Sequence, residues 1–552
     1  MTAVYQPPEF SSPIDLDLSR NEGRPTVTSI DLDPEDLAAA TSRYPDTTRL
    51  ARAVAARHGL TVDRVLVTAG GDDALFRCFL SSAGRAVVAT TPTFEMVRRY
   101  TAQLDTPLIE VPWWDGDFPV DDFLAEAAGP GMAVVVSPNN PTGNVVTRAD
   151  LRKVSDSYPL VVLDAAYTEF ADDDLTEAAL EMGNVVVIRT LSKAFGLAGL
   201  RVGYLLGGED VVRRLAAYGS PYSISALSSA LAAAALETRV TDAVDFAAAV
   251  AGRRQRLIEL LDELGCRPLP SQGNFVLATD VDPSWLVPAA ASLGIGLRSF
   301  ADRLDLARCV RITVPASEED FARLERTLRS ALAPKALLFD MDGVLADVTE
   351  SFRAAIVETA ARFGVSVTEA DIASAKAEGN ASDDWDLTRR LCSSAGVDVP
   401  FEMVREQFES IYQGSNERDG LKVRERLLVG PDVLESWSTR YLLGIVTARP
   451  RADAAEFLDR FDIGRFFSAV VAREDAPSKP DPAPVRLALS RLGVDRSWMF
   501  GDTVDDLNAA RGAGVVPIGV TVPGNDRSAL SSCARLVESV DEIEEVLNAT
   551  KS

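Results

Sequence analysis

Two groups of residues in the sequence have the types and spacing to do chemistry. The first surrounds Lys193, one of seven lysines in a chain that holds 49 arginines. Because a lysine can lose its proton and an arginine cannot, a retained lysine is a candidate nucleophile and proton carrier. The second group holds four aspartates, a threonine and a lysine between Asp340 and Asp506. Such aspartates can act as nucleophiles, as acids, or as oxygen ligands of a hard cation.

The first group is assembled from three segments that each follow a short apolar run. They are the turn Ser137–Gly143, the sequence Asp164–Tyr167 and the stretch Arg189–Tyr204. Ligands of an open α/β sheet bind outside the carboxyl ends of its strands, so these segments should meet there. Taken singly, each has a plain explanation as a turn, a helix cap or a solvated charge. Their combination favours a binding site.

These segments resemble the fold-type I aminotransferases that use pyridoxal phosphate, and among them the histidinol-phosphate aminotransferases. The resemblance extends over about residues 14–330 and is most specific in Thr190–Tyr204. It implies that Lys193 binds the cofactor covalently and carries protons, and that Asp164 pairs with the nitrogen of the cofactor ring. It also implies that Asn140 and Tyr167 form hydrogen bonds with the ring hydroxyl.

The resemblance further implies a cradle for the cofactor's phosphate at the start of a helix, where free N–H groups and the helix dipole favour an anion. The residues that it assigns to this cradle are Gly71, Asp72, Thr190, Ser192 and Arg201. Phe94 would stack on the cofactor ring. Tyr44, in Arg43–Asp46, matches a tyrosine that reaches the cofactor phosphate of the partner subunit, which implies a homodimer with shared sites.

Two arginines match the anion-binding pair of the family, Arg298 and Arg311. In most relatives the second binds a substrate carboxylate, whereas in histidinol-phosphate enzymes both bind the substrate phosphate. Arg298 has an alternative explanation as a surface charge. Asn21, a further candidate substrate residue, lies in Ser19–Pro25, which departs from the family's usual Asn-Glu-Asn-Pro run, and Pro315 stands where glycine is usual. These departures leave the identity of the substrate open.

The second group lies in four motifs of the C-terminal part. The motifs are Ala336–Leu345, Ile445–Arg449, Ser478–Pro482 and Phe500–Asp506. The Asp-x-Asp-Gly run in the first could belong to an ordinary loop or a calcium loop, but the other calcium ligands are absent. Together the motifs resemble the haloacid-dehalogenase superfamily of phosphatases, over about residues 335–550.

This second resemblance implies a role for each polar residue of the motifs. Asp340 would attack phosphorus, and Asp342 would protonate the leaving alcohol and then activate water. Thr447 and Lys479 would bind the oxygens of the phosphoryl group during transfer. The ligands implied for Mg²⁺ are Asp340, the main-chain carbonyl of Asp342, Asp502 and, in support, Asp506.

The residues between about Val348 and Arg426 read as mostly helical, with no obvious strand. The resemblance implies that they form a cap, which excludes water and recognises the leaving group. Gly379–Trp385 is the most unusual segment of this cap. Either it is a helix cap followed by a core tryptophan, or it is a patch that contacts the substrate.

A transaminase and a phosphatase on one chain suggest consecutive steps on one phosphorylated compound. The leading hypothesis is amination of imidazole-acetol phosphate by glutamate to histidinol phosphate, followed by hydrolysis to histidinol, as in histidine biosynthesis. The alternative keeps an aminotransferase or a decarboxylase beside the phosphatase, but acts on another phosphorylated amino acid or a specialised metabolite. A non-enzymatic regulator or scaffold is disfavoured, since Lys193, Asp164, Asp340 and Asp342 are all intact.

The elements that must position these groups follow an α/β pattern, in which short apolar strands alternate with helical stretches. We expect a fold-type I pyridoxal-phosphate transferase domain over residues 1–333, with a large domain at about 36–240 and a small domain from 1–35 and 241–333. We expect a Rossmann-like haloacid-dehalogenase domain with a helical cap over residues 334–552, and the cap at about 348–426.

Composition narrows the function classes further. The 552 residues are 47% hydrophobic and carry a formal charge of −26, which argues against nucleic acid and anionic membranes as partners. The single histidine, His58, excludes sites that need several histidines. The net charge does not exclude small phosphorylated substrates, which a local site can still attract. Five scattered cysteines without a CxxC pair, and a start without a signal-peptide pattern, predict a cytoplasmic protein.

Overall fold

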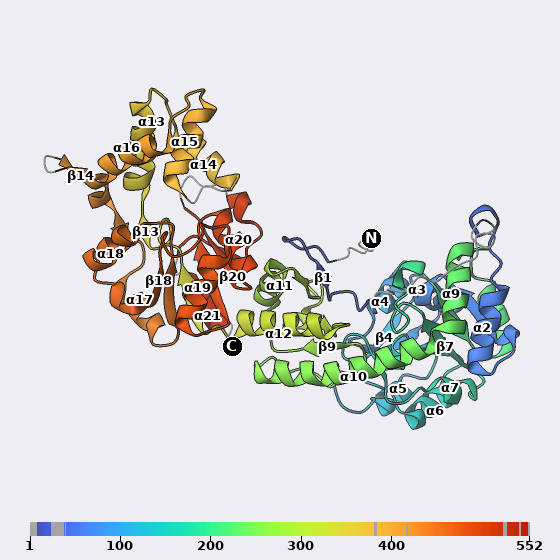
Figure 1. Cartoon of the computed structure of the whole chain (residues 1–552). Coiled ribbons are helices and arrows are strands. Elements are labelled where there is room, and N and C mark those ends of the chain that lie inside the picture. Colours follow the sequence, from blue (N-terminus) through green and yellow to red (C-terminus); the bar gives the residue numbers. More distant parts are fainter. Residues whose placement is uncertain are drawn as a thin grey trace. The chain divides into compact units, whose positions relative to one another are not determined.

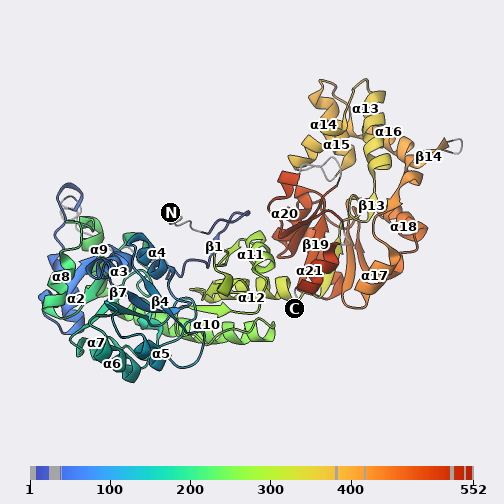
Figure 2. The ribbon, with the colours of Figure 1, turned by 180° about the vertical axis from the view of Figure 1, so that it is seen from behind.

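The computed structural model describes residues 8–23, 38, 40–379, 383–415, 418–522, 527–539 and 542–549. The chain forms two compact units that do not follow chain order. The first unit comprises residues 1–8, 18–280 and 297–321, and the second comprises residues 9–17, 281–296 and 322–552. Figures 1 and 2 show both units from opposite sides, and in each of them helices surround a central sheet.

A seven-stranded sheet forms the centre of the first unit. Its strands, in spatial order, are β2 (Val65–Thr68), β8 (Gly203–Leu206), β7 (Val185–Thr190), β6 (Val161–Asp164), β5 (Met132–Val136), β3 (Val87–Thr91) and β4 (Leu108–Pro112). All neighbours pair in parallel except β8, which is antiparallel to both β2 and β7. The central strands β5, β6 and β7 are buried along their whole length, which explains their continuous apolar sequences.

Helices cover this sheet on both faces, and a smaller antiparallel pair of strands lies beside it. The helices are α2 (Thr48–His58), α3 (Gly70–Ser81), α4 (Glu95–Gln103), α5 (Val120–Ala125), α6 (Arg148–Ser157), α7 (Thr176–Leu180), α8 (Glu209–Ala216), α9 (Ala226–Thr238) and α10 (Val240–Glu263). The small pair consists of β9 (Phe275–Ala278) and β11 (Val310–Thr313). These elements confirm the α/β class expected for this part of the chain.

A six-stranded parallel sheet forms the centre of the second unit. Its order is β18 (Phe467–Val471), β17 (Leu442–Val446), β12 (Ala336–Phe339), β19 (Ser497–Gly501), β20 (Val516–Val520) and β21 (Arg535–Val537). The helices packed around it are α17 (Pro431–Ser438), α18 (Arg451–Arg460), α19 (Ala483–Leu492), α20 (Val504–Gly512) and α21 (Ile543–Ala549). This all-parallel sheet confirms the expected Rossmann-like fold.

A helical insert follows β12 and gathers at one end of this sheet, as Figure 1 shows. It contains α13 (Ala354–Arg362), α14 (Glu369–Ala377), α15 (Asp384–Ser394) and α16 (Phe401–Gln413). The expectation that no strand occurs here is wrong in detail. The two-residue strands β14 (Gly414–Ser415) and β15 (Arg418–Asp419) pair with each other, and β13 (Ala346–Asp347) pairs with β16 (Arg426–Leu427). Strands of two residues are too short to produce an alternating pattern.

The second unit also holds elements from earlier in the chain: β1 (Leu16–Asp17), β10 (Ile295–Gly296), α11 (Pro283–Ser292) and most of α12 (Glu318–Leu332). The buried indole rings of Trp285 and Trp498 lie 4.5 Å apart. Trp285 donates a hydrogen bond to the carbonyl of Ala331, and Trp498 donates one to the carbonyl of Ser330. α11 and α12 therefore share a hydrophobic core with the parallel sheet.

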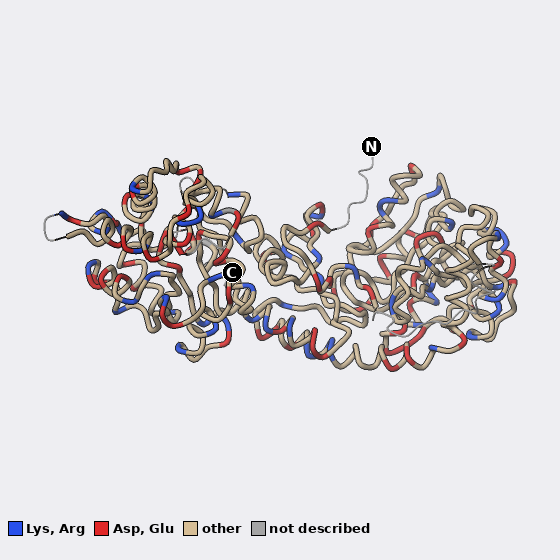
Figure 3. Tube along the Cα trace, turned by 45° about the horizontal axis from the view of Figure 1, so that its top comes forward, with Lys and Arg blue, Asp and Glu red and all other residues tan. Residues whose placement is uncertain are grey.

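Acidic and basic residues are interspersed along the chain in both units (Figure 3). All five cysteines are buried and free. His58 lies at the end of α2 beside the Tyr204 hydroxyl, 3.1 Å away, and burial lowers its pKa to about 4. Across the residues that the structure describes, we find no helix with both the length and the apolar character needed to cross a membrane.

Candidate active sites

The first candidate site lies at the carboxyl ends of three adjacent strands. Asp164 ends β6, the turn Ser137–Gly143 follows β5, and Lys193 follows the end of β7. Asp164 is buried, and its carboxylate accepts a hydrogen bond from the amide of Ala166 at 3.2 Å. Burial raises the pKa of Asp164 to about 7. A buried carboxyl of this kind favours a positively charged partner.

Lys193 faces the N-terminal segment that crosses this edge of the sheet. Its Nζ donates a hydrogen bond to the carbonyl of Arg20 at 3.4 Å and lies 5.5 Å from the centre of the Tyr167 ring. A Cβ atom at Gly23 would lie 1.6 Å from the carbonyl oxygen of Lys193, so only glycine fits there. This close approach fixes the start of the chain beside the lysine.

A buried hydrogen-bond network connects four of the residues predicted for this site. The Nδ2 atoms of Asn21 and Asn140 lie 3.2 Å and 3.4 Å from the Tyr167 hydroxyl. Arg311 donates to Asn140 Oδ1 at 2.6 Å and to the carbonyl of Ser19 at 2.6 Å. The N-terminal segment that departs from the family pattern thus contributes directly to the site through Asn21.

The predicted pair of arginines lies together beside this network. Arg298 and Arg311 are antiparallel partners that exchange main-chain hydrogen bonds of 3.1 Å and 2.9 Å. The side chain of Arg298 is only 16% exposed and pairs with Glu95 at 3.0 Å. Phe94 precedes Glu95 at the start of α4 and packs partly buried against the core. The side chain of Arg298 is therefore largely buried and paired, and it is not an exposed surface charge.

The residues predicted to hold a phosphate lie at the start of α3 and after β7. No side chain caps α3, whose first turn contains Gly71 and Asp72. Thr190 donates a hydrogen bond to Ser192 at 2.9 Å, and Arg201 donates one to Asp72 at 2.9 Å. An uncapped helix start beside hydroxyl groups and a guanidinium fits a phosphate group. With Asp164 and Lys193, this donor set fits pyridoxal phosphate.

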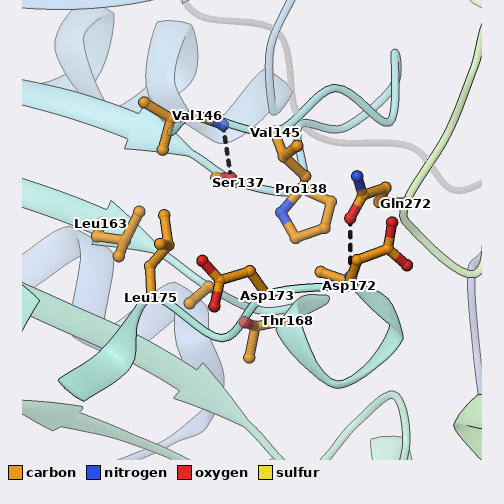
Figure 4. A pocket seen from close by; sticks show the side chains of 12 residues that line it. Ser137, Pro138, Val145, Val146, Leu163, Thr168, Asp172, Asp173, Leu175 and Gln272 are labelled. Carbon is orange, nitrogen blue, oxygen red and sulfur yellow. Dashed lines mark hydrogen bonds between the residues drawn. The ribbon is translucent and has the colours of Figure 1, made fainter. Parts of the chain in front are cut away.

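Tyr44 does not join these residues within the chain. Tyr44 is 81% exposed and its ring stacks on that of Tyr222, a residue that is 62% exposed, with the ring centres 4.7 Å apart. A separate small pocket lies beside the site, between the turn that begins at Ser137 and the segment from Ala165 to Leu175 (Figure 4). Figure 4 shows Gln272 and Asp172 hydrogen-bonded at its rim.

The second candidate site lies at the carboxyl ends of β17, β12 and β19, the three central strands of the parallel sheet. Thr447, Asp340 and Asp502 directly follow these strands. Lys479 is buried among them, with its Nζ 2.8 Å from Asp340 and 2.5 Å from Asp506. Burial opposes the charge on Lys479, yet the two carboxylates outweigh it and raise its pKa. Lys479 therefore remains protonated.

The three carboxylates of Asp340, Asp502 and Asp506 converge. One oxygen of each lies within 4.8 Å of the others, and all three residues are buried. Burial raises the pKa of Asp340 and of Asp502, and the neighbouring carboxylates raise it further. Lys479, joined at Asp502 by Lys376, lowers it only in part. Clustered oxygen ligands with excess negative charge fit Mg²⁺. A Cβ atom at Gly343 would lie 2.5 Å from Asp502, so this turn also requires glycine.

Asp342 takes part in a network that the sequence analysis did not foresee. Arg449 donates to its carboxylate at 2.7 Å and also contacts Glu425 at 3.0 Å. Arg449 is buried, and Tyr412 donates a hydrogen bond to Glu425 at 3.0 Å. Since Tyr412 and Glu425 belong to the insert, Arg449 connects the insert to Asp342. The only hint in the sequence is the position of Arg449, two residues after Thr447.

Comparison with known proteins adds two family matches. The family described as aminotransferase class I and II matches residues 26–372, and the family described as haloacid dehalogenase-like hydrolase matches residues 337–520. A histidinol-phosphate aminotransferase from Thermoanaerobacter pseudethanolicus is 34% identical over 287 residues, which cover 50% of this chain and 80% of that protein.

Two further proteins extend the comparison. An imidazoleglycerol-phosphate dehydratase from Phytophthora nicotianae is 46% identical over 197 residues, which cover 34% of this chain and 44% of that protein. The present chain thus spans less than half the length of that relative. The solved structure of histidinol-phosphate aminotransferase from Sinorhizobium meliloti in complex with pyridoxal-5'-phosphate is 26% identical, with a TM-score of 0.50, and covers 58% of this chain and 92% of that chain.

Proposed function

Because the chain belongs to the class I and II aminotransferases and carries a haloacid dehalogenase-like hydrolase domain after them, we propose that it performs two consecutive reactions. The first transfers an amino group from glutamate to imidazole-acetol phosphate and gives histidinol phosphate. The second hydrolyses histidinol phosphate to histidinol. We also propose that the boundary between the two catalytic domains lies between residues 333 and 334. The proposed location of the protein is the cytoplasm.

The observation that carries the proposal is that two complete sets of chemically matched residues lie on one chain. Lys193 and Asp164 belong to the first set, and the convergent carboxylates with Lys479 belong to the second. The relatives named for histidinol phosphate and imidazoleglycerol phosphate support an imidazole-bearing phosphate ester as the shared substrate class.

In the first reaction, pyridoxal phosphate supplies a ring that accepts electrons from the substrate's α carbon. Its phosphate would be held by Gly71, Asp72, Thr190, Ser192 and Arg201, and its ring by Phe94, Asn140, Asp164 and Tyr167. Lys193 Nζ moves a proton to and from the substrate's α carbon, which a permanently charged arginine could not do. Arg298 and Arg311 bind the anionic end of the substrate, and Asn21 orients it through Tyr167.

In the second reaction, a carboxylate oxygen of Asp340 attacks phosphorus while Asp342 gives a proton to the departing alcohol. Asp342 then removes a proton from water, which attacks the phosphorylated aspartate and releases inorganic phosphate. Thr447 and Lys479 hold the phosphoryl oxygens. Mg²⁺, which Asp340, Asp502, Asp506 and the carbonyl of Asp342 would bind, supplies positive charge against the phosphate.

We further propose that the chain acts as a homodimer through its aminotransferase part. Tyr44 and Tyr222 present a stacked and exposed aromatic pair close to the start of α2. Aromatic pairs of this kind are unusual on a free surface and typical of interfaces. Sedimentation of the wild type and of a Tyr44→Ala variant tests this proposal, because the variant should shift toward the monomer. The variant should also lose transamination activity.

The experiment for the proposed function is phosphate release by wild type and Asp340→Asn, with histidinol phosphate beside phosphoserine and threonine phosphate. We expect strong release from histidinol phosphate that the variant lacks. The alternative function, with another phosphorylated amino acid, would appear as preferred release from one of the other esters. Carbon dioxide release would instead indicate a decarboxylase.

A further inference from the structure

Two oppositely charged residues of the insert lie largely buried beside the phosphatase residues. Lys376 belongs to α14 and Asp384 begins α15, and Lys376 Nζ lies 3.8 Å from Asp384 Oδ1. Their side chains are only 13% and 14% exposed. Lysine and aspartate are rarely buried to this degree without a functional or structural partner. The mechanism proposed above uses neither residue.

Both residues of the pair interact with charged residues of the second candidate site. Lys376 interacts electrostatically with Asp502 and Asp342, and Asp384 interacts with Asp342 and Arg449. Gly379, between the two helices, lies so close to α20 that a Cβ atom there would be 3.3 Å from Asp505. The pair therefore lies in the part of the insert that adjoins the phosphatase residues, where the leaving group of a bound phosphate ester would meet it.

The start of α15 is held in this position by a residue of the sheet's own loops. Arg473, just after β18, forms an ion pair with Asp383 and lies 4.1 Å from the centre of the Trp385 ring. Asp383 in turn caps α15 by accepting a hydrogen bond from the amide of Trp385. The carboxylate of Asp384 is thus fixed between two anchored neighbours, as a recognition group must be.

We propose that Asp384 recognises the leaving group by accepting a hydrogen bond from its cationic amino group, with Lys376 holding Asp384 ionised. The inference rests on the proposed function, in which transamination places an ammonium group on the ester that the phosphatase receives. A fixed carboxylate attracts that ammonium and repels esters that carry a carboxylate at the same place, so it provides selection as well as binding. Residues 380–382, the centre of the unusual cap segment, lie outside the described residues.

The test compares two esters that differ only in the amino group: L-histidinol phosphate and its deamino analogue, 3-(imidazol-4-yl)propyl phosphate. We expect Asp384→Asn to raise KM for histidinol phosphate at least tenfold, to leave kcat within about twofold, and to leave both constants for the deamino ester unchanged. Asp384→Glu keeps the negative charge and should retain most of the preference for histidinol phosphate over the deamino ester. Asp386→Asn, on the same helix and paired with Arg389, is the matched control and should behave as wild type.

If Asp384→Asn raises KM equally for both esters, or for neither of them, the inference is overturned. The transaminase activity of each variant, together with its melting temperature, reports whether the chain is folded. If wild type hydrolyses histidinol phosphate and Asp384→Asn keeps the same preference, only the role of Asp384 is wrong. If wild type hydrolyses neither ester, the proposed function fails and this inference fails with it.

Discussion

Lys193 and Lys479 show two uses of an ammonium group in one chain. Lys479 is buried between Asp340 and Asp506, whose charges keep it protonated, so it serves as a fixed positive charge. Lys193 instead donates a hydrogen bond to the carbonyl of Arg20 and lies 5.5 Å from the centre of the Tyr167 ring. Because both residues are lysines, the different roles that we assign to them follow from the residues that surround each ammonium group.

Replacing Lys193 tests this assignment. Both Lys193→Ala and Lys193→Arg should lower transamination by about 10³-fold or more, because neither can donate and recover a proton at the substrate's α carbon. Phosphate release from histidinol phosphate should stay at the wild-type rate and shows that the variant is folded. An arginine variant that retains transamination would contradict the role of Lys193. Rapid-mixing absorbance with glutamate provides the measurement.

Asp164 gives a prediction about pH. Its pKa is about 7 in the folded, cofactor-free chain, mainly because of burial, and lies at its ordinary value of 3.8 after unfolding. The folded state therefore holds the proton more tightly, and the stability contributed by this group falls as the pH rises from about 4 to about 7. At pH 8, Asp164→Asn should stabilise the cofactor-free protein by up to about 4 kcal/mol, since one pKa unit corresponds to about 1.4 kcal/mol.

The measurement is thermal unfolding of the cofactor-free wild type and variant at pH 4.5 and pH 8. The gain in melting temperature should be large at pH 8 and only about a quarter as large at pH 4.5, where the unfolded carboxyl is still partly protonated. With pyridoxal phosphate added, the order should reverse, because the variant lacks the carboxylate that pairs with the cofactor. A variant whose melting temperature differs equally from that of wild type at both pH values would contradict the burial argument.

Among the elements, strand ends bring the sites together. Both sets of proposed catalytic residues follow buried parallel strands, and these strands could be predicted from their continuous apolar sequences. The edge strand β4 was not predicted, since only Val111 of its five residues is buried and the strand has no continuous apolar sequence. Arg449 and Lys376 were not predicted as site residues either. Their contacts come from a helical insert whose packing cannot be inferred from local sequence patterns.

The contact between Arg473 and the start of α15 gives a prediction at this scale. Arg473→Ala removes a charge-assisted bond worth about 1.5–3 kcal/mol. Amide exchange in the first turn of α15 should become about tenfold faster or more, while exchange in α19 should not change. Arg527→Ala, which removes an exposed ion pair with Glu538, is the control and should leave α15 unaffected. Unchanged exchange in the Arg473 variant would show that this contact does not hold the insert.

At the scale of the whole molecule, the phosphatase sheet is joined to earlier parts of the chain by packing as well as by sequence. Residues 9–17, 281–296 and most of α12 belong to the same compact unit as the sheet. The buried indoles of Trp285 and Trp498 and their hydrogen bonds to the carbonyls of α12 form part of this shared core. The sequence predicted a boundary near residue 333, but it contained no pattern that would place α11 against the second sheet.

This shared core predicts that the C-terminal part depends on α11 and α12. Trp498→Ala should destabilise the second unit by about 3–5 kcal/mol, because it leaves a large cavity beside Trp285. Trp498→Phe keeps an aromatic ring but loses the hydrogen bond to Ser330, and should cost about 1 kcal/mol. Chemical denaturation followed by phosphate release measures both. Equal stability of the alanine variant and wild type would contradict a shared core.

The central claim is that one chain carries out amination and then hydrolysis on the same compound. The most direct measurement is mass spectrometry of a single reaction that contains imidazole-acetol phosphate, glutamate, pyridoxal phosphate and Mg²⁺. Wild type should form histidinol, Asp340→Asn should accumulate histidinol phosphate, and Lys193→Ala should leave the keto phosphate without an amino group. Formation of no aminated product by wild type, or accumulation of histidinol phosphate that wild type does not hydrolyse, would contradict the claim.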